Sequence, residues 1–346
     1  MVIIMRFLWK SVKQVLGSMV LIALLILAVS CSTVSKNKGG NFELIDLEYP
    51  VLLVHGAGFR DKTLGVNYWG RIPKYFTRHG VKVYYGGTDA WGSIESNADK
   101  LKNKIIAILQ ENNVEKVHII AHSRGGLESR YLISTLNMAN AVASLTTIST
   151  PHHGVKAMNI AVKTPDGLYK FCSFFVNIWF KMLGDKKPDY FTSSRQLSEI
   201  YCIEFNKNNP DNENIFYQSY AAQMKYFFSD FVFIIMNPYI RMTDGANDGL
   251  CPVESAKWGN FKGVITTKGA FGISHAGVID AYRIKYKGVD IPEFYLNIIK
   301  ELSANEFFRS EILSDIPLDI PDILDLIEIT PDADEELPDK LSPTNF

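Results

Sequence analysis

One short segment constrains the fold of this chain more than any other: VHIIAHSRGG, at residues 117–126. A mostly apolar run leads into Ala121, and His-Ser-Arg and two glycines follow, before a stretch with helical character. This order predicts a buried strand, a very tight turn and a helix, with Ser123 at the turn, where the pattern G-x-S-x-G places a nucleophile. Ala121 and Gly125, two positions to either side of the serine, are small enough for strand and helix to pass close together. The segment therefore predicts that Ser123 is a nucleophile.

An upstream segment has the features of an oxyanion loop. Residues 49–54 form a continuous apolar run, as in a strand covered on both faces, and the run ends in HGAG. A glycine-bearing loop after such a strand can supply a backbone amide to a developing negative oxygen. A second amide, that of Arg124, is expected at the N-terminus of the helix after Ser123, where it points at the same oxygen. We therefore predict an oxyanion hole made by the backbone amides of Ala57 and Arg124.

The order of the remaining segments predicts an α/β fold. Strand-like and helix-like segments alternate, which specifies a mostly parallel central sheet flanked by helices, with right-handed crossovers. Ligand chemistry in such sheets lies at the carboxyl ends of the strands. The further strands are expected at residues 81–86, 143–148, 215–220 and 263–267, and the further helices at residues 68–79, 96–109 and from 278 onwards.

A serine nucleophile needs a base, normally a histidine held by a carboxylate. Of the seven histidines in the chain, only His275 lies downstream of the Asp-rich loop at residues 242–253. This position fits the order serine, acid, histidine of the corresponding sheet proteins. Asp244 and Asp248 both remain candidates for the acid at this point. We predict that His275 is the base and that one of these two carboxylates orients it.

Three further histidines lie close to these motifs. His122 and His152 are expected to be structural or to support the site from behind, because buried structural histidines outnumber catalytic ones. His55 follows a strand and precedes the oxyanion loop. We expect it to brace that loop rather than to act as a base.

Residues 155–200 interrupt the alternation of strands and helices. The segment follows a strand end and is strongly apolar, with lysines on both sides of the apolar stretch. Such an insertion above a strand end can act as a movable lid over an apolar site. The alternative is a buried helix of the core. The apolar residues in question are Phe171, Phe174, Phe175, Val176, Ile178, Trp179, Phe180, Met182 and Leu183.

Residues 1–30 have the features of an export signal. Basic residues precede an apolar run from residue 15 to residue 29, which ends in small residues before Cys31 and is short for a membrane span. This arrangement resembles the lipobox of bacterial lipoproteins, which implies cleavage before Cys31 and lipidation of that cysteine. We expect a lipid anchor, a tether over residues 31–48, and a place in the bacterial cell envelope outside the cytoplasm, at the outer membrane or cell surface. A secreted protein is the alternative.

Residues 311–346 form an acidic tail after a body at residues 49–310. The tail holds eleven Asp or Glu residues, one Lys and five Pro, a composition that disfavours a regular helix. Since the whole chain has a formal net charge of −1, the part between the leader and the tail carries an excess of positive charge. That excess suits an anionic lipid surface, although a scattered basic surface without a role is an equal alternative.

The motifs together resemble the secreted bacterial triacylglycerol lipases, the true-lipase family of the α/β-hydrolase fold. The resemblance covers residues 49–300 and rests on YPVLLVHG, KVHIIAHSRGGLESRYL, LTTISTPHHG, NDGLCPVESAKWG and SHAG, in that order. It implies an α/β-hydrolase fold with a lid at residues 155–200. It also implies that the Asp of NDGL, Asp248, is the acid of the triad, and that Ala57 and Arg124 supply the oxyanion amides.

The chain departs from the family pattern at three places. Family members usually have Gly where Ala121 stands, and Ala is small enough to be tolerated. Many members place a calcium-binding Asp two residues after the triad His, where this chain has Gly277. We therefore expect no cofactor and no metal, and calcium binding is not supported. The family's disulfide has no obvious counterpart: Cys202 with Cys251 is one pairing, and Cys172 leaves others open.

These observations predict a serine hydrolase that cleaves carboxylic esters of lipids, with Ser123, His275 and Asp248 as triad and an acyl-enzyme intermediate. Its expected partners are lipid esters, the lipid–water interface and the membrane that holds the anchor, and no nucleic acid. A phospholipase or lipid acyltransferase with the same machinery is one alternative, which a phosphate bound by Arg124 would favour. A surface lipoprotein that binds lipid without turnover is another.

Overall fold

The structure is a computed structural model that describes residues 42–63 and 65–314. The predicted leader, Cys31 and nearly all of the acidic tail lie outside the described residues. The chain divides into two units, residues 1–304 and residues 305–346. In the described part, no helix is long and apolar enough to cross a membrane.

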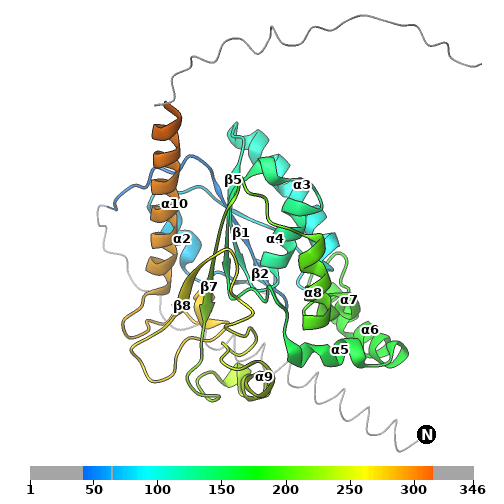
Figure 1. The fold of residues 1–346 in the computed structure, drawn as a ribbon. Coiled ribbons are helices and arrows are strands. Elements are labelled where there is room, and N and C mark those ends of the chain that lie inside the picture. The colour runs from blue at the N-terminus through cyan, green and yellow to red at the C-terminus, as the bar shows by residue number, and fades with distance from the viewer. Residues whose placement is uncertain (1–41, 64, 315–346) are drawn as a thin grey trace, which may run out of the picture. The chain divides into compact units, whose positions relative to one another are not determined.

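The first unit is built on a six-stranded sheet in the order β4-β1-β5-β6-β7-β8 (Figure 1). Every neighbouring pair in this sheet is parallel, which confirms the predicted α/β architecture. A separate antiparallel pair joins β2 and β3. The strands are β1 (Val51–Val54), β2 (Lys62–Thr63), β3 (Val66–Asn67), β4 (Val83–Tyr85), β5 (Val117–His122), β6 (Val142–Ile148), β7 (Phe216–Ala222) and β8 (Asn260–Ile265).

Helices connect the strands and cover both faces of the sheet (Figure 1). The α-helices are α2 (Ile72–Arg78), α3 (Ile94–Asn112), α4 (Gly125–Ser134), α5 (Asn159–Lys163), α6 (Asp166–Met182), α7 (Tyr190–Arg195), α8 (Glu199–Asn208), α9 (Met236–Asp244) and α10 (Ile291–Ser314). Short 3-10 turns are η1 (Ala139–Ala141), η2 (Lys156–Met158), η3 (Phe231–Phe233) and η4 (Gly277–Ile279).

The two faces of β1 show how the core is divided. Val51 and Leu53 pack in a cluster with α2 and the first part of α10. Leu52 and Val54 point to the other face and pack with α3 and α4. Successive side chains of a strand alternate between faces, and all four residues are fully buried. The continuous apolar run in the sequence is therefore that of a strand covered on both sides.

The helix that leads into the elbow strand is defined by its ends. The Ser93 side chain accepts a hydrogen bond from the Ser96 amide at the start of α3, and Asn113 ends the helix in the left-handed conformation. Both are common solutions for the unpaired backbone groups of helix termini. The helix is longer at both ends than the predicted 96–109.

The prediction of a helix from residue 278 onwards is wrong. Only the short turn η4 forms there, and α10 starts at Ile291. Asp280 and Arg283 have φ of 58° and 55°, a left-handed conformation that a continuing helix cannot contain. Asp280 is held in this place by Arg71, whose guanidinium and amide bond its carboxylate. At its other end α10 runs to Ser314, four residues into the segment predicted as tail.

The pairing of Cys202 with Cys251, which the sequence left open among others, does not form. Cys172, Cys202 and Cys251 are free thiols in the structure. The Cys202 thiol faces the carbonyl oxygens of Pro151 and Gln196, and the Cys251 thiol faces that of Pro252. Burial raises the pKa of both thiols, so these two side chains behave as small core residues.

Candidate active site

The turn between β5 and α4 has the strained geometry that the sequence predicts for a nucleophile elbow. Ser123 has φ of 55°, a left-handed conformation that a residue with a side chain rarely adopts. A Cβ on Gly125 would lie 2.5 Å from the carbonyl oxygen of His55, so only glycine fits where the start of α4 passes the end of β1. The steric reason given for small residues around the serine is therefore confirmed at Gly125.

Asp248 and His275 form a buried pair at the same edge of the sheet. Oδ2 of Asp248 lies 2.8 Å from Nδ1 of His275, and the His275 amide donates to the Asp248 carbonyl at 2.8 Å. The other carboxylate oxygen accepts from the amides of Leu250 and Cys251. Asp248 is fully buried and His275 is 7% exposed. The carboxylate is thus held in place by two backbone amides on one oxygen and presents the other oxygen to the imidazole.

The residue before Ser123 lies beside this pair. The ring of His122, the residue before the serine, lies 4.3 Å from the ring of His275 between centroids. The structure thus brings the end of β5, directly before Ser123, close to His275, which is 152 positions after the serine in the sequence. Asp248 contacts Nδ1 of this histidine, as the acid of a serine hydrolase triad does.

Asp244, the other candidate acid, lies in a different environment. Its carboxylate accepts hydrogen bonds from the amides of Lys156 and Ala157 and from the Thr243 hydroxyl. It therefore caps η2 at the beginning of the apolar insertion. The residue pattern did not decide which of the two carboxylates orients the histidine. In the structure Asp248 contacts the histidine, and Asp244 supports the insertion.

The loop after β1 is held against the nucleophile. A Cβ on Gly56 would lie 2.5 Å from the Ser123 Cβ, so the backbone passes directly beside the serine. His55 contacts the Gly56 carbonyl through Nδ1 at 2.8 Å and Thr88 through Nε2. These are the contacts expected of a brace. Because the Gly56 carbonyl and the Ala57 amide belong to one planar peptide unit, this bond also sets the direction of the Ala57 N–H.

The two amides predicted to form the oxyanion hole share a property. Among the hydrogen bonds of the described residues, none is donated by the backbone N–H of Ala57 or of Arg124. Paired backbone amides are the rule in protein interiors. Amides without an internal acceptor are what the predicted oxyanion hole requires.

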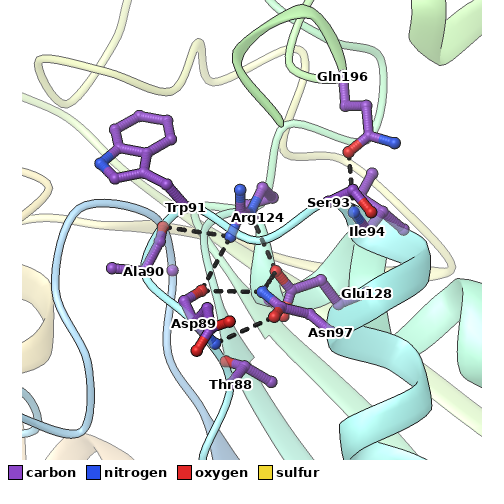
Figure 2. A network of polar contacts seen from close by, with 12 residues as sticks. Thr88, Asp89, Ala90, Trp91, Ser93, Ile94, Asn97, Arg124, Glu128 and Gln196 are labelled. Atoms are coloured by element: carbon purple, nitrogen blue, oxygen red, sulfur yellow. Dashed lines mark hydrogen bonds and ion pairs between the residues drawn. The ribbon is translucent and has the colours of Figure 1, made fainter. Parts of the chain in front are cut away.

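The side chain of Arg124 is not a free cation beside Ser123. It is fully buried, and its Nε lies 3.0 Å from Oε1 of Glu128. Nη2 donates to the carbonyl oxygens of Asp89 and Ala90, and the guanidinium lies over the Trp91 ring at 5.9 Å. Figure 2 shows this network. The suggestion that Arg124 binds a phosphate is therefore not supported, because the guanidinium is fully buried and already paired with the Glu128 carboxylate.

One contact of the histidine loop was not foreseen. Ser274, next to His275, donates to Oδ2 of Asp230 at 2.5 Å, and Tyr282 donates to the same oxygen. The Ser274 hydroxyl also accepts from the Gly277 amide. Asp230 is 44 residues away in the sequence and belongs to no motif, so only the tertiary structure reveals it as a support of the loop that carries His275.

The predicted insertion forms η2, α5, α6 and α7. Helix α6 exposes much of its apolar surface, including Phe171 and Phe174, which are 58% and 59% exposed. It is therefore not the buried core helix of the alternative interpretation. A second exposed apolar group lies on the segment before and along α9. It consists of Tyr226, Phe227, Phe228, Phe231, Ile235, Tyr239 and Met242.

The family model for palmitoyl protein thioesterase matches residues 50–227, just over half of the chain. The chain belongs to this family. The matched residues contain the oxyanion loop and the Ser123 elbow, and the Asp248–His275 pair follows them.

Curated relatives agree with the lipase resemblance. Triacylglycerol lipase 2 of Saccharomyces cerevisiae is 29% identical over 267 residues, which are 70% of this chain and 76% of the yeast protein. A triacylglycerol lipase of Pseudarthrobacter phenanthrenivorans is 31% identical over 174 residues, 47% of this chain and 54% of that one. The resemblance stated from the motifs is confirmed, and the protein is a serine hydrolase of carboxylic esters.

Solved structures show the same fold. Staphylococcus hyicus lipase superposes with a TM-score of 0.59 at 21% identity, covering 79% of this chain and all of that one. A metagenomic carboxyl esterase gives 0.58 at 15% identity, with 82% of each chain covered. The α/β-hydrolase fold of this family member is therefore confirmed.

Proposed function

We propose that this ester hydrolase cleaves long-chain acyl esters of lipids, acylglycerols first among them, at a lipid–water interface. The observation that carries the proposal is the Asp248–His275 pair beside the strained Ser123, next to an insertion whose helix α6 exposes apolar side chains. The first part supplies the chemistry and the second part supplies contact with a lipid.

The chemistry follows the Ser-His-Asp scheme. Ser123 attacks the ester carbonyl while His275 takes its proton through Nε2, because Nδ1 is engaged by Asp248. The amides of Ala57 and Arg124 stabilise the negative oxygen of the tetrahedral intermediate. His275 then protonates the leaving alcohol, and the acyl-enzyme remains. Water, activated by His275, releases the fatty acid. This sequence needs no cofactor.

The exposed apolar residues support a lipid as substrate. On α6, Phe171, Phe174, Ile178 and Met182 are between 45% and 76% exposed. Their removal from water against an acyl surface is favourable by about 25 cal/mol per Å². We propose that α6 and its neighbours act as a lid that docks on lipid.

An acyl thioester is a second candidate substrate. The match to the palmitoyl protein thioesterase family supports it. The triad serves this reaction equally well, since a thiolate leaves more readily than an alkoxide and demands less of His275 as an acid. Comparison of palmitoyl-CoA with tripalmitin separates the two substrates.

The other candidate functions have weaker support. A phospholipase or acyltransferase uses the same triad, but it loses the argument from Arg124, whose guanidinium is bound to Glu128. A lipid-binding lipoprotein without turnover has no need of the strained serine and the buried pair. Labelling of Ser123 by a fluorophosphonate separates an enzyme from such a binder.

We also propose that Cys31 carries a lipid anchor and that the protein lies in the bacterial cell envelope outside the cytoplasm. The basic and apolar leader and the cysteine after it support this proposal. Metabolic labelling with a fatty acid should mark the full chain and not Cys31→Ser. A labelled Cys31→Ser protein would contradict the anchor, and an unanchored protein in the medium would favour secretion.

The test of the proposed activity is hydrolysis of p-nitrophenyl esters from acetate to palmitate by the full chain in detergent and by Ser123→Ala. Activity that rises with chain length and is lost in Ser123→Ala supports a lipase. Activity on short chains alone would make the protein a carboxylesterase and contradict the lid. Ser123→Ala with wild-type activity would contradict the assigned nucleophile.

A further inference from the structure

A tyrosine that no motif includes connects the oxyanion loop with the residue before the nucleophile. The Gly56 amide donates to the Tyr68 hydroxyl at 2.9 Å, and the same hydroxyl lies 2.7 Å from Nδ1 of His122. Tyr68 follows β3 and is buried, with 8% of its surface exposed. One hydroxyl therefore joins the loop after β1 to the end of β5.

The direction of these hydrogen bonds follows from the protonation of the partners. Burial raises the pKa of Tyr68 well above its usual range, so the hydroxyl keeps its proton. Burial, with smaller effects of His275 and His55, holds the pKa of His122 well below its usual range. His122 is thus neutral. Since the Gly56 amide already donates to the hydroxyl oxygen, we assign the hydroxyl proton to Nδ1 of His122. The imidazole proton then lies on Nε2, which has no hydrogen-bond partner among the described residues.

Gly56 is fixed at both of its backbone polar groups. Tyr68 holds its N–H, and His55 holds its C=O. A side chain at this position would lie 3.0 Å from the Tyr68 hydroxyl and closer still to Ser123. The residue is therefore locked between the tyrosine and the nucleophile, and the next amide along the chain is that of Ala57.

We propose that Tyr68 is a positioning residue for the oxyanion hole, which acts through the Gly56 amide and is itself oriented by His122. The inference rests on the proposed assignment of Ser123 and of the Ala57 amide. The hydroxyl of Tyr68 is engaged by the Gly56 amide and by His122, so Tyr68 acts through the backbone. It holds the backbone so that the Ala57 N–H is already in place when the oxyanion forms.

The neutral His122 has a second consequence for the site. Its ring lies 4.3 Å from that of His275, which becomes positively charged during the reaction. A charged neighbour at this distance would oppose that change. By donating a hydrogen bond to Nδ1, Tyr68 favours the uncharged form of His122.

The test uses the full chain in detergent, with active sites counted by a fluorophosphonate that labels Ser123. Loss of one oxyanion donor typically costs about 10²–10³ in kcat, so misplacement of one should cost at least about tenfold. We expect Tyr68→Phe to lower kcat per labelled site by about tenfold or more, with KM within about twofold. Tyr75→Phe is the control, because it removes a hydroxyl from α2, outside the site.

The partner residue supplies a rescue experiment. In His122→Asn the amide oxygen can replace Nδ1 as acceptor, whereas His122→Leu leaves the Tyr68 hydroxyl without one. We expect His122→Leu to lose about as much kcat as Tyr68→Phe, the double variant to lose little more, and His122→Asn to lose less. If Tyr68→Phe does not fold, the comparison of His122→Asn with His122→Leu still tests the inference.

Two results would overturn the inference. One is a Tyr68→Phe protein with wild-type kcat per labelled site and only a lower Tm, which would make Tyr68 a structural brace. The other is equal kcat in His122→Asn and His122→Leu. A Ser123→Ala protein that stays active would instead contradict the proposed function, so the two failures are distinguishable.

Discussion

Asp89 and Asp185 each accept hydrogen bonds from the backbone amides that directly follow the other residue. The Asp89 carboxylate accepts from the amides of Lys186 and Lys187 at 2.9 and 2.7 Å. The Asp185 carboxylate accepts from the amides of Ala90 and Trp91, both at 3.0 Å. These hydrogen bonds tie the segment after α6 to the loop at residues 89–91. The Asp89 and Ala90 carbonyl oxygens of that loop accept from the Arg124 guanidinium (Figure 2). The insertion is thus connected, through this loop and Arg124, to the nucleophile elbow.

The first prediction concerns this connection. Asp185→Ala leaves two backbone amides without their acceptor, and each buried unpaired group costs about 1–3 kcal/mol. We expect a matching fall in the free energy of unfolding, measured with urea, and faster proteolysis within residues 155–195. Asp166→Ala, which removes a 63% exposed carboxylate on α6, is the control. Equal stability of the two variants would contradict the role of Asp185.

The second prediction concerns pH. Burial works to raise the pKa of Asp89, but the Lys100 ammonium and the Lys186 and Lys187 amides hold it below its usual value. For a carboxyl with a lowered pKa, the stabilisation is present above the unfolded value of about 3.9 and is lost as pH falls through the folded one. Asp89→Asn should therefore be less stable than wild type at pH 7 by urea unfolding, and this difference should shrink in acid.

Asp185 gives the control for that experiment. Burial raises the pKa of its carboxyl, although the Ala90 and Trp91 amides oppose the shift. A raised carboxyl pKa favours the folded state at low pH. Asp185→Asn still contains the Asp89 carboxylate. Its stability should therefore still fall as the pH is lowered into the acid range, whereas Asp89→Asn should lack this loss. The same pH dependence in both variants would refute the assignment to Asp89.

The third prediction separates the two candidate acids. Asp248→Asn replaces the oxygen that faces Nδ1 of His275 and should lower kcat by about 10³–10⁴, as expected when the histidine loses its orienting carboxylate. Asp244→Asn weakens only the cap of η2 and should lower Tm with kcat within about threefold. Steady-state kinetics on one soluble ester decides, and similar kcat values for both variants would speak against the assigned triad.

The fourth prediction concerns the buried ion pair of Arg124 and Glu128. Glu128→Ala leaves a buried guanidinium without its carboxylate, which typically costs about 3–5 kcal/mol. The double variant Arg124→Met with Glu128→Leu should lose less, because no charge stays buried. Unfolding by urea measures both. The exposed pair Lys257–Glu254 is the matched control, and its removal should change stability little. A double variant worse than Glu128→Ala would contradict this account.

The fifth prediction concerns α6. Phe171→Ser combined with Phe174→Ser should lower binding to phosphatidylcholine vesicles and activity on emulsified tripalmitin by about tenfold, since two apolar side chains of the docking face are lost. Activity on a short soluble ester should stay within about twofold. Ile106→Ser, on α3 and 39% exposed, should change neither. Equal loss on soluble and emulsified substrates would argue against docking.

The sequence determined the sheet and the elbow, because these depend on local properties of the chain. The apolar run of β1 and the small residues around Ser123 carry their own geometric consequence: a strand buried on both faces and a turn that only a small neighbour permits. For the same reason the sequence predicted the positions of the oxyanion loop and of His275, since each follows the end of a strand.

Only the tertiary structure decided which polar groups meet. Asp244 and Asp248 look alike in the sequence, and the packing of η2 and of the His275 loop assigns them different partners. Arg124 looks like a free cation beside the serine until Glu128, one helical turn on, and the carbonyl oxygens of a distant loop occupy it. Hydrogen bonds between segments far apart in sequence leave no periodic pattern, so the chain alone does not reveal them.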